Sequence, residues 1–157
     1  IPTIREIGKR IIDAGVKIAF IKAGHRGAYL LTGDVSSINE KTGFNLQKER
    51  WNDQELWCNA FPIDAAKVKN ASGAGDTASA AFLAAILDGE YPEHALKYAA
   101  MAGRNCLYCT DIYSELDDWA QMREELKSVL VKISNLKLAK YNDLPDLEMA
   151  ANEWRDR

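Results

Sequence analysis

A glycine-rich turn followed at once by an acidic residue is the segment of this sequence whose chemistry is clearest. Residues 70–82 read NASGAGDTASAAF, so Gly73 and Gly75 flank an alanine, Asp76 comes next, and small apolar residues then recur at helical spacing. Backbone N–H groups at the start of a helix bind anions, and a carboxylate beside them can accept a proton. The pattern therefore predicts transfer of a phosphoryl group to an alcohol, with the amides holding the charge and Asp76 acting as the base.

Two other glycine motifs that bind phosphates fit the segment less well. A P-loop needs a lysine beside its phosphates, but no lysine follows Gly75 until Lys97. Residues 73–78 formally satisfy the dinucleotide pattern G-x-G-x-x-G/A, yet the lead-in KVKNAS is polar where an apolar strand is expected. The Pro92 turn stands where an acidic residue should end a second strand, and an acid inside the turn would repel a pyrophosphate. We therefore favour the base-and-amide interpretation.

Asp76 also has a purely structural interpretation. An acidic residue in the first turn of a helix stabilises that helix by about 0.3–1 kcal/mol through the helix dipole. This explains the acid but not the two glycines, which cost stability unless the backbone must approach something closely. The turn residues Gly73, Ala74 and Gly75 are therefore predicted to form an anion hole.

The composition is that of an ordinary globular domain and excludes several classes of partner. The 157 residues are 47% hydrophobic and 27% charged, which is enough for one domain with a core. A net charge of −3 predicts no nucleic-acid or anionic-membrane partner. The longest apolar run, Ala80–Leu87, is too short to span a bilayer, and without a signal segment we expect a cytoplasmic protein. The chain begins without methionine inside a helical pattern, as expected for a piece of a longer protein.

Three cysteines cannot all pair with one another, which disfavours a disulfide framework. Cys106 and Cys109 form a C-x-x-C motif, but Cys58 and the two histidines supply no second clustered pair of zinc ligands. A redox pair would lie at the start of a helix, whereas this motif ends a helical pattern. We predict buried thiols and no metal site.

The elements around the turn alternate between helix and strand, which indicates an α/β layer architecture. Residues 33–54 are polar and patternless and predict a surface excursion. The strand after it is expected to run antiparallel to its neighbour because the connections are short. Apolar spacing predicts helices over 3–13, 77–87, 92–107 and 114–133, and strands within 16–24, 27–33 and 55–61.

The segment NASGAGDTASAAF resembles the C-terminal signature of ribokinase-like (PfkB-type) carbohydrate kinases, which is built around G-A-G-D. The resemblance implies that Asp76 is the catalytic base and that Gly73, Ala74 and Gly75 form the anion hole. Asn70–Ser72 replaces the family's Asp-Thr-Thr. Several relatives bind a monovalent cation near that segment, and the missing carboxylate weakens the case for such a cation here.

A second segment, IKAGHRGAYL, resembles the family's strand-G-x-x-G-strand segment, which contacts the phosphates of ATP. A family asparagine near the adenine aligns with Ala100, so that contact differs here, whereas Gly103 can line the pocket with its backbone. The nucleotide-binding residues that the resemblance implies are Lys22, Gly24, Arg26, Gly27, Gly75, Ala100 and Gly103.

The resemblance covers residues from about 3 to 130 and implies a layered α/β/α ribokinase-like fold. This chain would be its C-terminal half only, with a mixed, mostly parallel sheet. The implied activity is that of an ATP-dependent kinase that phosphorylates a hydroxyl of a sugar or sugar-like alcohol, with Mg²⁺ held mainly by the nucleotide. We expect residues 1–133 to be the nucleotide-binding and catalytic-base part, and residues 134–157 to be an extension of unknown role.

Other functions stay open from the sequence alone. A nucleoside kinase of the same superfamily shares this catalytic half, and a regulatory domain could bind a nucleotide without catalysis. The sequence also leaves open whether the protein forms a homodimer. The family's substrate and lid residues belong to a half that this sequence lacks, so we expect the chain alone to be weak or inactive.

Overall fold

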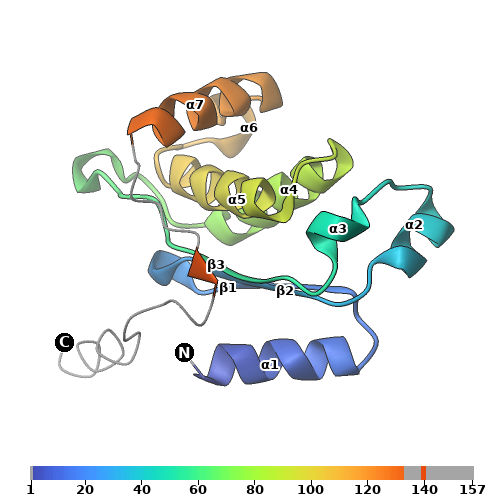
Figure 1. Cartoon of the computed structure of the whole chain (residues 1–157). Coiled ribbons are helices and arrows are strands. Elements are labelled where there is room, and N and C mark those ends of the chain that lie inside the picture. The colour runs from blue at the N-terminus through green and yellow to red at the C-terminus, as the bar shows by residue number, and fades with distance from the viewer. Residues whose placement is uncertain (1, 133–138, 141–157) are drawn as a thin grey trace.

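A four-stranded sheet with helices on both faces is the frame of the molecule (Figure 1). The computed structural model of the protein describes residues 2–132 and 139–140. Helix α1 (Pro2–Asp13) covers one face of the sheet, and α4 (Ala74–Leu87) and α5 (Pro92–Leu107) cover the other. The strands in spatial order are β1 (Ile18–Lys22), β2 (Ala28–Thr32), β3 (Glu55–Cys58) and β4 (Ala139–Lys140). The α/β class expected from the sequence is confirmed.

Shorter elements connect these layers, and one further helix packs outside them. Helix α7 (Trp119–Lys132) contacts α5 on the side away from the sheet (Figure 1). The short elements are η1 (Gly24–Arg26), α2 (Ser36–Thr42), α3 (Lys48–Trp51), η2 (Ala65–Lys67) and α6 (Ile112–Glu115).

The direction of the strands corrects one expectation. All three pairings among the described strands are antiparallel, whereas the ribokinase-like resemblance implies a mixed, mostly parallel sheet. Parallel neighbours need a crossover of a dozen or more residues, but β1 and β2 pair from Lys22 opposite Ala28 with only a tight turn between them. The antiparallel direction expected for the strand at 55–61 is confirmed by the pairing of Leu30 with Leu56.

Helix α1 is fixed to the sheet through a close contact and an ionic one. A Cβ on Gly8 would lie 2.7 Å from Cε1 of Tyr29, so a glycine lets the helix approach that buried ring. The Tyr29 hydroxyl donates to Glu55 at 2.7 Å, and the Arg5 guanidinium pairs with the same carboxylate at 2.7 Å. The N-terminal helix is thereby tied to both β2 and β3.

Helices α4 and α5 form an antiparallel pair whose contact surface consists of small residues. Ala85, Ala95 and Ala99 are almost completely buried. A Cβ on Gly103 would lie only 3.3 Å from the carbonyl oxygen of Ala74, so the two backbones approach each other closely at the first turn of α4. Phe82 of α4 stacks on Phe20 of β1 with ring centroids 4.3 Å apart. The start of α4 is therefore held by both the sheet and α5.

Residues 33–54 contain more order than their sequence suggests. They form α2 and α3, and three isolated apolar residues of the segment lie in the core, namely Val35 before α2, Leu46 between the two helices and Trp51 at the end of α3. The Thr32 hydroxyl donates to the carbonyl of Trp51. Isolated apolar residues give no periodic pattern, which is why the sequence predicts only an excursion.

The helix predicted over residues 114–133 is two helices, α6 and α7. The Asp111 carboxylate accepts from the backbone N–H of Tyr113 at the start of α6, and Asp118 accepts from Gln121 before α7. Two such caps mark two helix starts. Met122 and Leu126 of α7 are both buried. Most of the expected extension, residues 134–157, lies outside the described residues.

Candidate functional site

A cavity of about 430 Å³ lies where the β1–β2 turn, the first turn of α4 and the middle of α5 meet. These three segments and the residues that follow β3 are far apart in the sequence, so only the folded chain can form the cavity. The sequence-predicted nucleotide residues that line it are Lys22, Gly24, Gly27, Gly75, Ala100 and Gly103.

The β1–β2 turn is held by its backbone. The Ala23 N–H donates to the Gly27 carbonyl at 2.8 Å, and the Gly27 N–H donates to Gly24 at 3.1 Å. Gly27 has φ +120°, and a Cβ there would lie 2.0 Å from the Cys58 carbonyl oxygen of β3. Only glycine fits this position, because both the conformation and the available space exclude a side chain. Because Gly24 and Gly27 have no side chains, backbone atoms of the turn line the cavity directly.

The first turn of α4 presents unpaired amides. Gly73 precedes the helix with φ +80°, and within the described chain no side chain caps this helix start. The first helical bond runs from the Thr77 N–H to the Gly73 carbonyl at 2.8 Å. The N–H groups of Ala74 and Gly75 come before it and therefore have no acceptor within the helix. Both residues line the cavity, at the positive end of the helix dipole.

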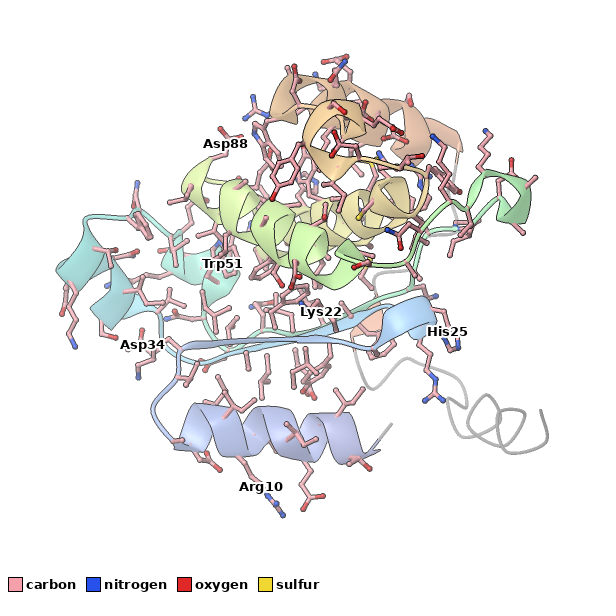
Figure 2. All side chains as sticks on the ribbon, turned by 180° about the vertical axis from the view of Figure 1, so that it is seen from behind. Arg10, Lys22, His25, Asp34, Trp51 and Asp88 are labelled. Carbon is pink, nitrogen blue, oxygen red and sulfur yellow. The ribbon has the colours of Figure 1, made fainter. Side chains whose placement is uncertain are left out.

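Lys22 joins the two glycine turns. Its ammonium donates to the Gly75 carbonyl and to the Ser79 hydroxyl, each at 2.7 Å. Figure 2 shows Lys22 in the space between the sheet and helix α4. An ammonium has three N–H donors, and these two bonds use two of them. The positive charge thus lies beside the helix start and at the edge of the cavity.

Three of the predicted site residues lie outside the cavity lining. Asp76 follows Gly75 in the first turn of α4, and its side chain is exposed to solvent. Gly73 lies one residue before the lining residue Ala74. Arg26 belongs to the same turn as Gly24 and is half-buried, yet it is absent from the part of the cavity wall that the structure describes.

The apolar wall of the cavity was missed by the sequence analysis. It includes Phe61 and Ile63, from the segment after β3, and Leu107 from the end of α5. The Arg104 guanidinium lies over the Phe61 ring, 5.3 Å from its centroid. The sequence shows that the residues after this strand, Phe61 and Ile63, are apolar. Their neighbours in the sequence do not show that they turn toward α5.

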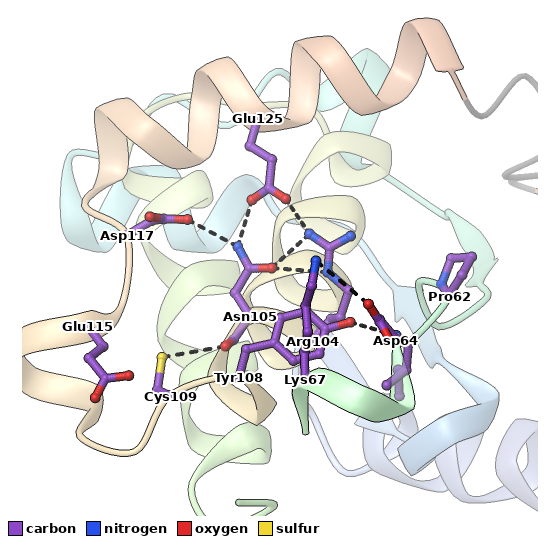
Figure 3. A pocket seen from close by; sticks show the side chains of 11 residues that line it. Pro62, Asp64, Lys67, Arg104, Asn105, Tyr108, Cys109, Glu115, Asp117 and Glu125 are labelled. Atoms are coloured by element: carbon purple, nitrogen blue, oxygen red, sulfur yellow. Dashed lines mark hydrogen bonds and ion pairs between the residues drawn. The ribbon is translucent and has the colours of Figure 1, made fainter. Parts of the chain in front are cut away.

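Figure 3 shows a second, more polar cavity of about 660 Å³. It adjoins the first cavity and shares Ile63 and Arg104 with it. Its centre is the buried amide of Asn105, which accepts from Arg104 at 2.7 Å and donates to Glu125 at 2.6 Å. The Arg104 guanidinium also pairs with Glu125. Asp117 accepts a longer bond of 3.3 Å from the same amide. The network fastens α7 to α5, behind the first cavity.

The three cysteines are free thiols inside the protein, as the sequence predicts. Burial raises the pKa of Cys58 to about 12 and also raises the pKa of Cys109. Cys106 lies in the last turn of α5, and Cys109 follows that helix. Among the described side chains, no group of three or more His, Cys, Asp or Glu could hold a metal ion. No helix in that part of the chain is long and apolar enough to cross a membrane.

The sequence matches the pfkB family carbohydrate kinases over residues 1–118, and the chain therefore belongs to this family. Its fold is similar to that of the Arabidopsis thaliana ribokinase solved with ribose and ATP, with a TM-score of 0.59 and 25% identity. That match covers 79% of this chain and 33% of the ribokinase. No curated protein sequence matches the chain.

Two other solved structures support the ribokinase-like fold. A ribokinase from Thermotoga maritima has a TM-score of 0.52 and 20% identity, over 78% of this chain and 34% of that protein. A protein from E. coli described as a putative ribokinase II has a TM-score of 0.56 and 17% identity, over 76% and 32%. The chain thus spans about a third of the length of these structures, with the fold expected from the two glycine motifs.

Proposed function

We propose that this chain is the nucleotide-binding and catalytic-base part of an ATP-dependent kinase that phosphorylates a hydroxyl of a sugar or sugar-like alcohol. One observation carries the proposal. The Lys22 ammonium at the end of β1 lies 2.7 Å from the Gly75 carbonyl, so both glycine motifs share one cavity. Membership of the pfkB carbohydrate kinase family supports the same activity.

The cavity has the size and the polarity that a nucleotide requires. Its volume of about 430 Å³ lies within the roughly 300–1,000 Å³ typical of ligand pockets. The wall with Phe61 and Ile63 suits a base, whereas Lys22 and the α4 amides suit phosphates. A Cβ on Gly75 would come within 3.5 Å of the Lys22 ammonium and fill the space between these groups. The residues present therefore fit ATP.

Magnesium would be held mainly by the nucleotide. Asp76 is a single carboxylate at the start of α4, and the described chain offers no cluster of three ligating side chains. Mg²⁺ commonly binds through one or two carboxylates together with substrate phosphates, so a nucleotide-borne ion is consistent with this surface. When bound, Mg-ATP supplies the phosphoryl group and neutralises charge that develops on it.

In this proposal, the residues of this chain move a proton and hold charge. The exposed carboxylate of Asp76 accepts the proton of the acceptor hydroxyl, and the amides of Ala74 and Gly75 hold the phosphoryl oxygens. Lys22 orients the same oxygens from the sheet side. A base of this kind typically accelerates a reaction by about 10²–10⁴-fold.

We propose residues 1–133 as this nucleotide and base part and residues 134–157 as an extension. The proposed acceptor is a sugar, since the Arabidopsis relative was solved with ribose. The residues that select the acceptor are expected in the two-thirds of the ribokinase fold that this chain does not span.

Thermal unfolding of the 157-residue chain with Mg-ATP, with NAD and without ligand tests the proposal first. A ligand at a hundredfold excess over its Kd stabilises the folded state by about 2.7 kcal/mol. For a domain of this size, that stabilisation raises Tm by about 5 °C. We expect a rise with Mg-ATP and none with NAD. An unchanged Tm with Mg-ATP would contradict the proposal.

The role of Asp76 is tested by Asp76→Asn. We expect Mg-ATP binding to persist within a factor of about two, since the carboxylate lies outside the cavity lining, while phosphoryl transfer to a sugar falls by about 10²-fold or more. Transfer is followed with radiolabelled ATP and ribose or fructose in the longer protein that carries the acceptor-binding half, because this chain alone is expected to be weak or inactive. Equal transfer by the variant would overturn the base assignment. Binding without transfer in either protein would favour a nucleotide-binding domain that lacks catalysis.

A further inference from the structure

The loop that leads into the anion-binding turn rests on the end of α5. The backbone N–H groups of Lys69 and Asn70 both donate to the Leu107 carbonyl, at 2.8 and 3.3 Å. The Cys106 thiol donates to the Ser72 carbonyl at 3.6 Å. Three of the four residues before Gly73 are thereby joined to the last turn of one helix.

Helix α6 supports the turn from the other side. A Cβ built on Gly73 would lie 2.7 Å from Cδ1 of Ile112, so that side chain fills the space beside the glycine. Gly73 needs its positive φ to start α4 where it does. The position of Ile112 therefore bears directly on the conformation of the turn.

One carboxylate fixes α6 in this position. Glu115 accepts from the Lys69 ammonium at 3.0 Å and from the Thr110 N–H at 3.1 Å with one oxygen. Its other oxygen accepts from the Asp111 N–H at 3.2 Å. Through its bonds to Thr110 and Asp111, Glu115 holds the segment after α5 in a compact turn. Through its bond to Lys69, it also links this segment to the loop before the anion-binding turn.

We propose that Glu115, acting through Lys69, is a positioning residue for the anion-binding turn Gly73–Gly75. The inference rests on the proposed function, because it treats this turn as the place where phosphate binds. Without the carboxylate, two backbone amides and an ammonium lose their acceptor. Ile112 is then free to move away from Gly73, and the amides of the turn lose their fixed direction.

The first test substitutes Glu115→Gln and measures Mg-ATP binding by titration calorimetry. Glutamine keeps the size of the side chain but removes its charge. We expect Kd to rise about tenfold, which corresponds to about 1.4 kcal/mol. Lys69→Met should reproduce this effect, and Lys69→Arg should keep most of the affinity because a cationic donor remains. The rescue distinguishes a contact at this position from a general packing effect.

The second test does not depend on nucleotide binding. Amide order parameters measured by NMR on the free chain are expected near 0.85 for Gly73–Gly75 in the original sequence and below about 0.6 in Glu115→Gln. The strands β1–β3 should keep their order parameters. The matched control is Glu124→Gln, which breaks the exposed pair with Lys127 on α7 and should change neither readout.

The outcomes separate the two proposals. If the original chain binds no Mg-ATP, the proposed function fails, and the order parameters still decide whether Glu115 holds the turn. If Mg-ATP binds and Glu115→Gln changes neither Kd nor the turn, the positioning role is overturned. It is also overturned if Glu115→Gln and Lys69→Met loosen β1–β3 as much as the turn, since the pair would then support only general stability.

Discussion

Two glycine turns face the same cavity, but the protein holds them by different means. The β1–β2 turn is fixed by backbone contacts, since Gly27 lies against the Cys58 carbonyl of β3. The α4 turn has backbone bonds only in the loop before it, and the turn itself is held by the side chains of Lys22, Ile112 and the Lys69–Glu115 pair. A turn held by backbone depends on glycine and little else. A turn held by side chains can be adjusted by several substitutions, and this is the turn to which we assign the chemistry.

The largest loss of stability is expected at Gly27, where the backbone of the β1–β2 turn contacts the backbone of β3. Gly27→Ala places a Cβ at φ +120° and 2.0 Å from a carbonyl oxygen that cannot move without the strand. We expect the free energy of unfolding to fall by about 4 kcal/mol, or the protein to fail to fold. Urea unfolding measures the change.

Gly24→Ala is the matched control in the same turn. Gly24 has φ +59°, and a Cβ there would meet no described atom within 4 Å. Only the left-handed strain remains, which costs about 1–2 kcal/mol. Equal losses for the two variants would show that the contact with β3 does not hold the turn.

A smaller loss of unfolding free energy is expected for Gly73→Ala, because the added Cβ would contact the end of the Ile112 side chain and not a backbone atom. The variant bears left-handed strain and a contact with Ile112, and we expect a loss of about 2 kcal/mol in unfolding free energy. Adding Ile112→Ala should relieve the contact, with a coupling of about 0.5–1 kcal/mol in a double-mutant cycle measured by urea unfolding. Strictly additive losses would mean that Ile112 does not press on the turn.

Lys22→Met should separate binding from stability. The side chain is exposed, so we expect unfolding free energy to change by about 1 kcal/mol or less. We expect Kd for Mg-ATP to rise about tenfold, since the charge beside the α4 amides is lost. Calorimetry measures the affinity, and Lys41→Met, an exposed change on α2, serves as control. Unchanged affinity would remove Lys22 from the nucleotide site.

The smallest effect concerns pH. The Lys69 ammonium first, and then the Thr110 and Asp111 N–H groups, hold the pKa of Glu115 below its ordinary value of 4.5. The stability that this carboxylate contributes is therefore present above pH 4.5 and is lost as pH falls through the lowered pKa. The difference in unfolding free energy between the original chain and Glu115→Gln should shrink as pH is lowered from about 6 to about 3. A difference that stays constant would show that the charge contributes nothing.

The sequence predicted the parts of the site that are local in the chain. Gly24, Gly27, Ala74 and Gly75 were found because a glycine turn beside a helix or strand is a pattern of adjacent residues. Phe61 was missed, because it reaches the cavity only through the pairing of β3 with β2. A sequence motif shows where the backbone can approach a ligand closely. The side chains that line the rest of the cavity are determined by tertiary packing.

Among the elements, long periodic segments were predicted best. Helices α4 and α5 bury a regular face, and the sequence located both. The strand direction was predicted wrongly for the sheet as a whole, because the resemblance implies a mostly parallel sheet whereas the short β1–β2 connection permits only an antiparallel pair. The caps at Asp111 and Asp118, at the starts of α6 and α7, are hydrogen bonds between side chain and backbone, and the apolar spacing that predicts one helix over 114–133 does not report them.

The bond between Lys22 and Gly75 also has a consequence for the order of folding. It joins residues 53 positions apart, whereas α4 and α5 are joined by a short turn. Closing a loop costs entropy that grows with its length, by about 0.6 kcal/mol for each doubling. The helical pair and the β1–β2 hairpin can therefore form early and independently, and the cavity between them is completed late. We therefore expect the part of the protein that would hold the nucleotide to acquire its shape late in folding.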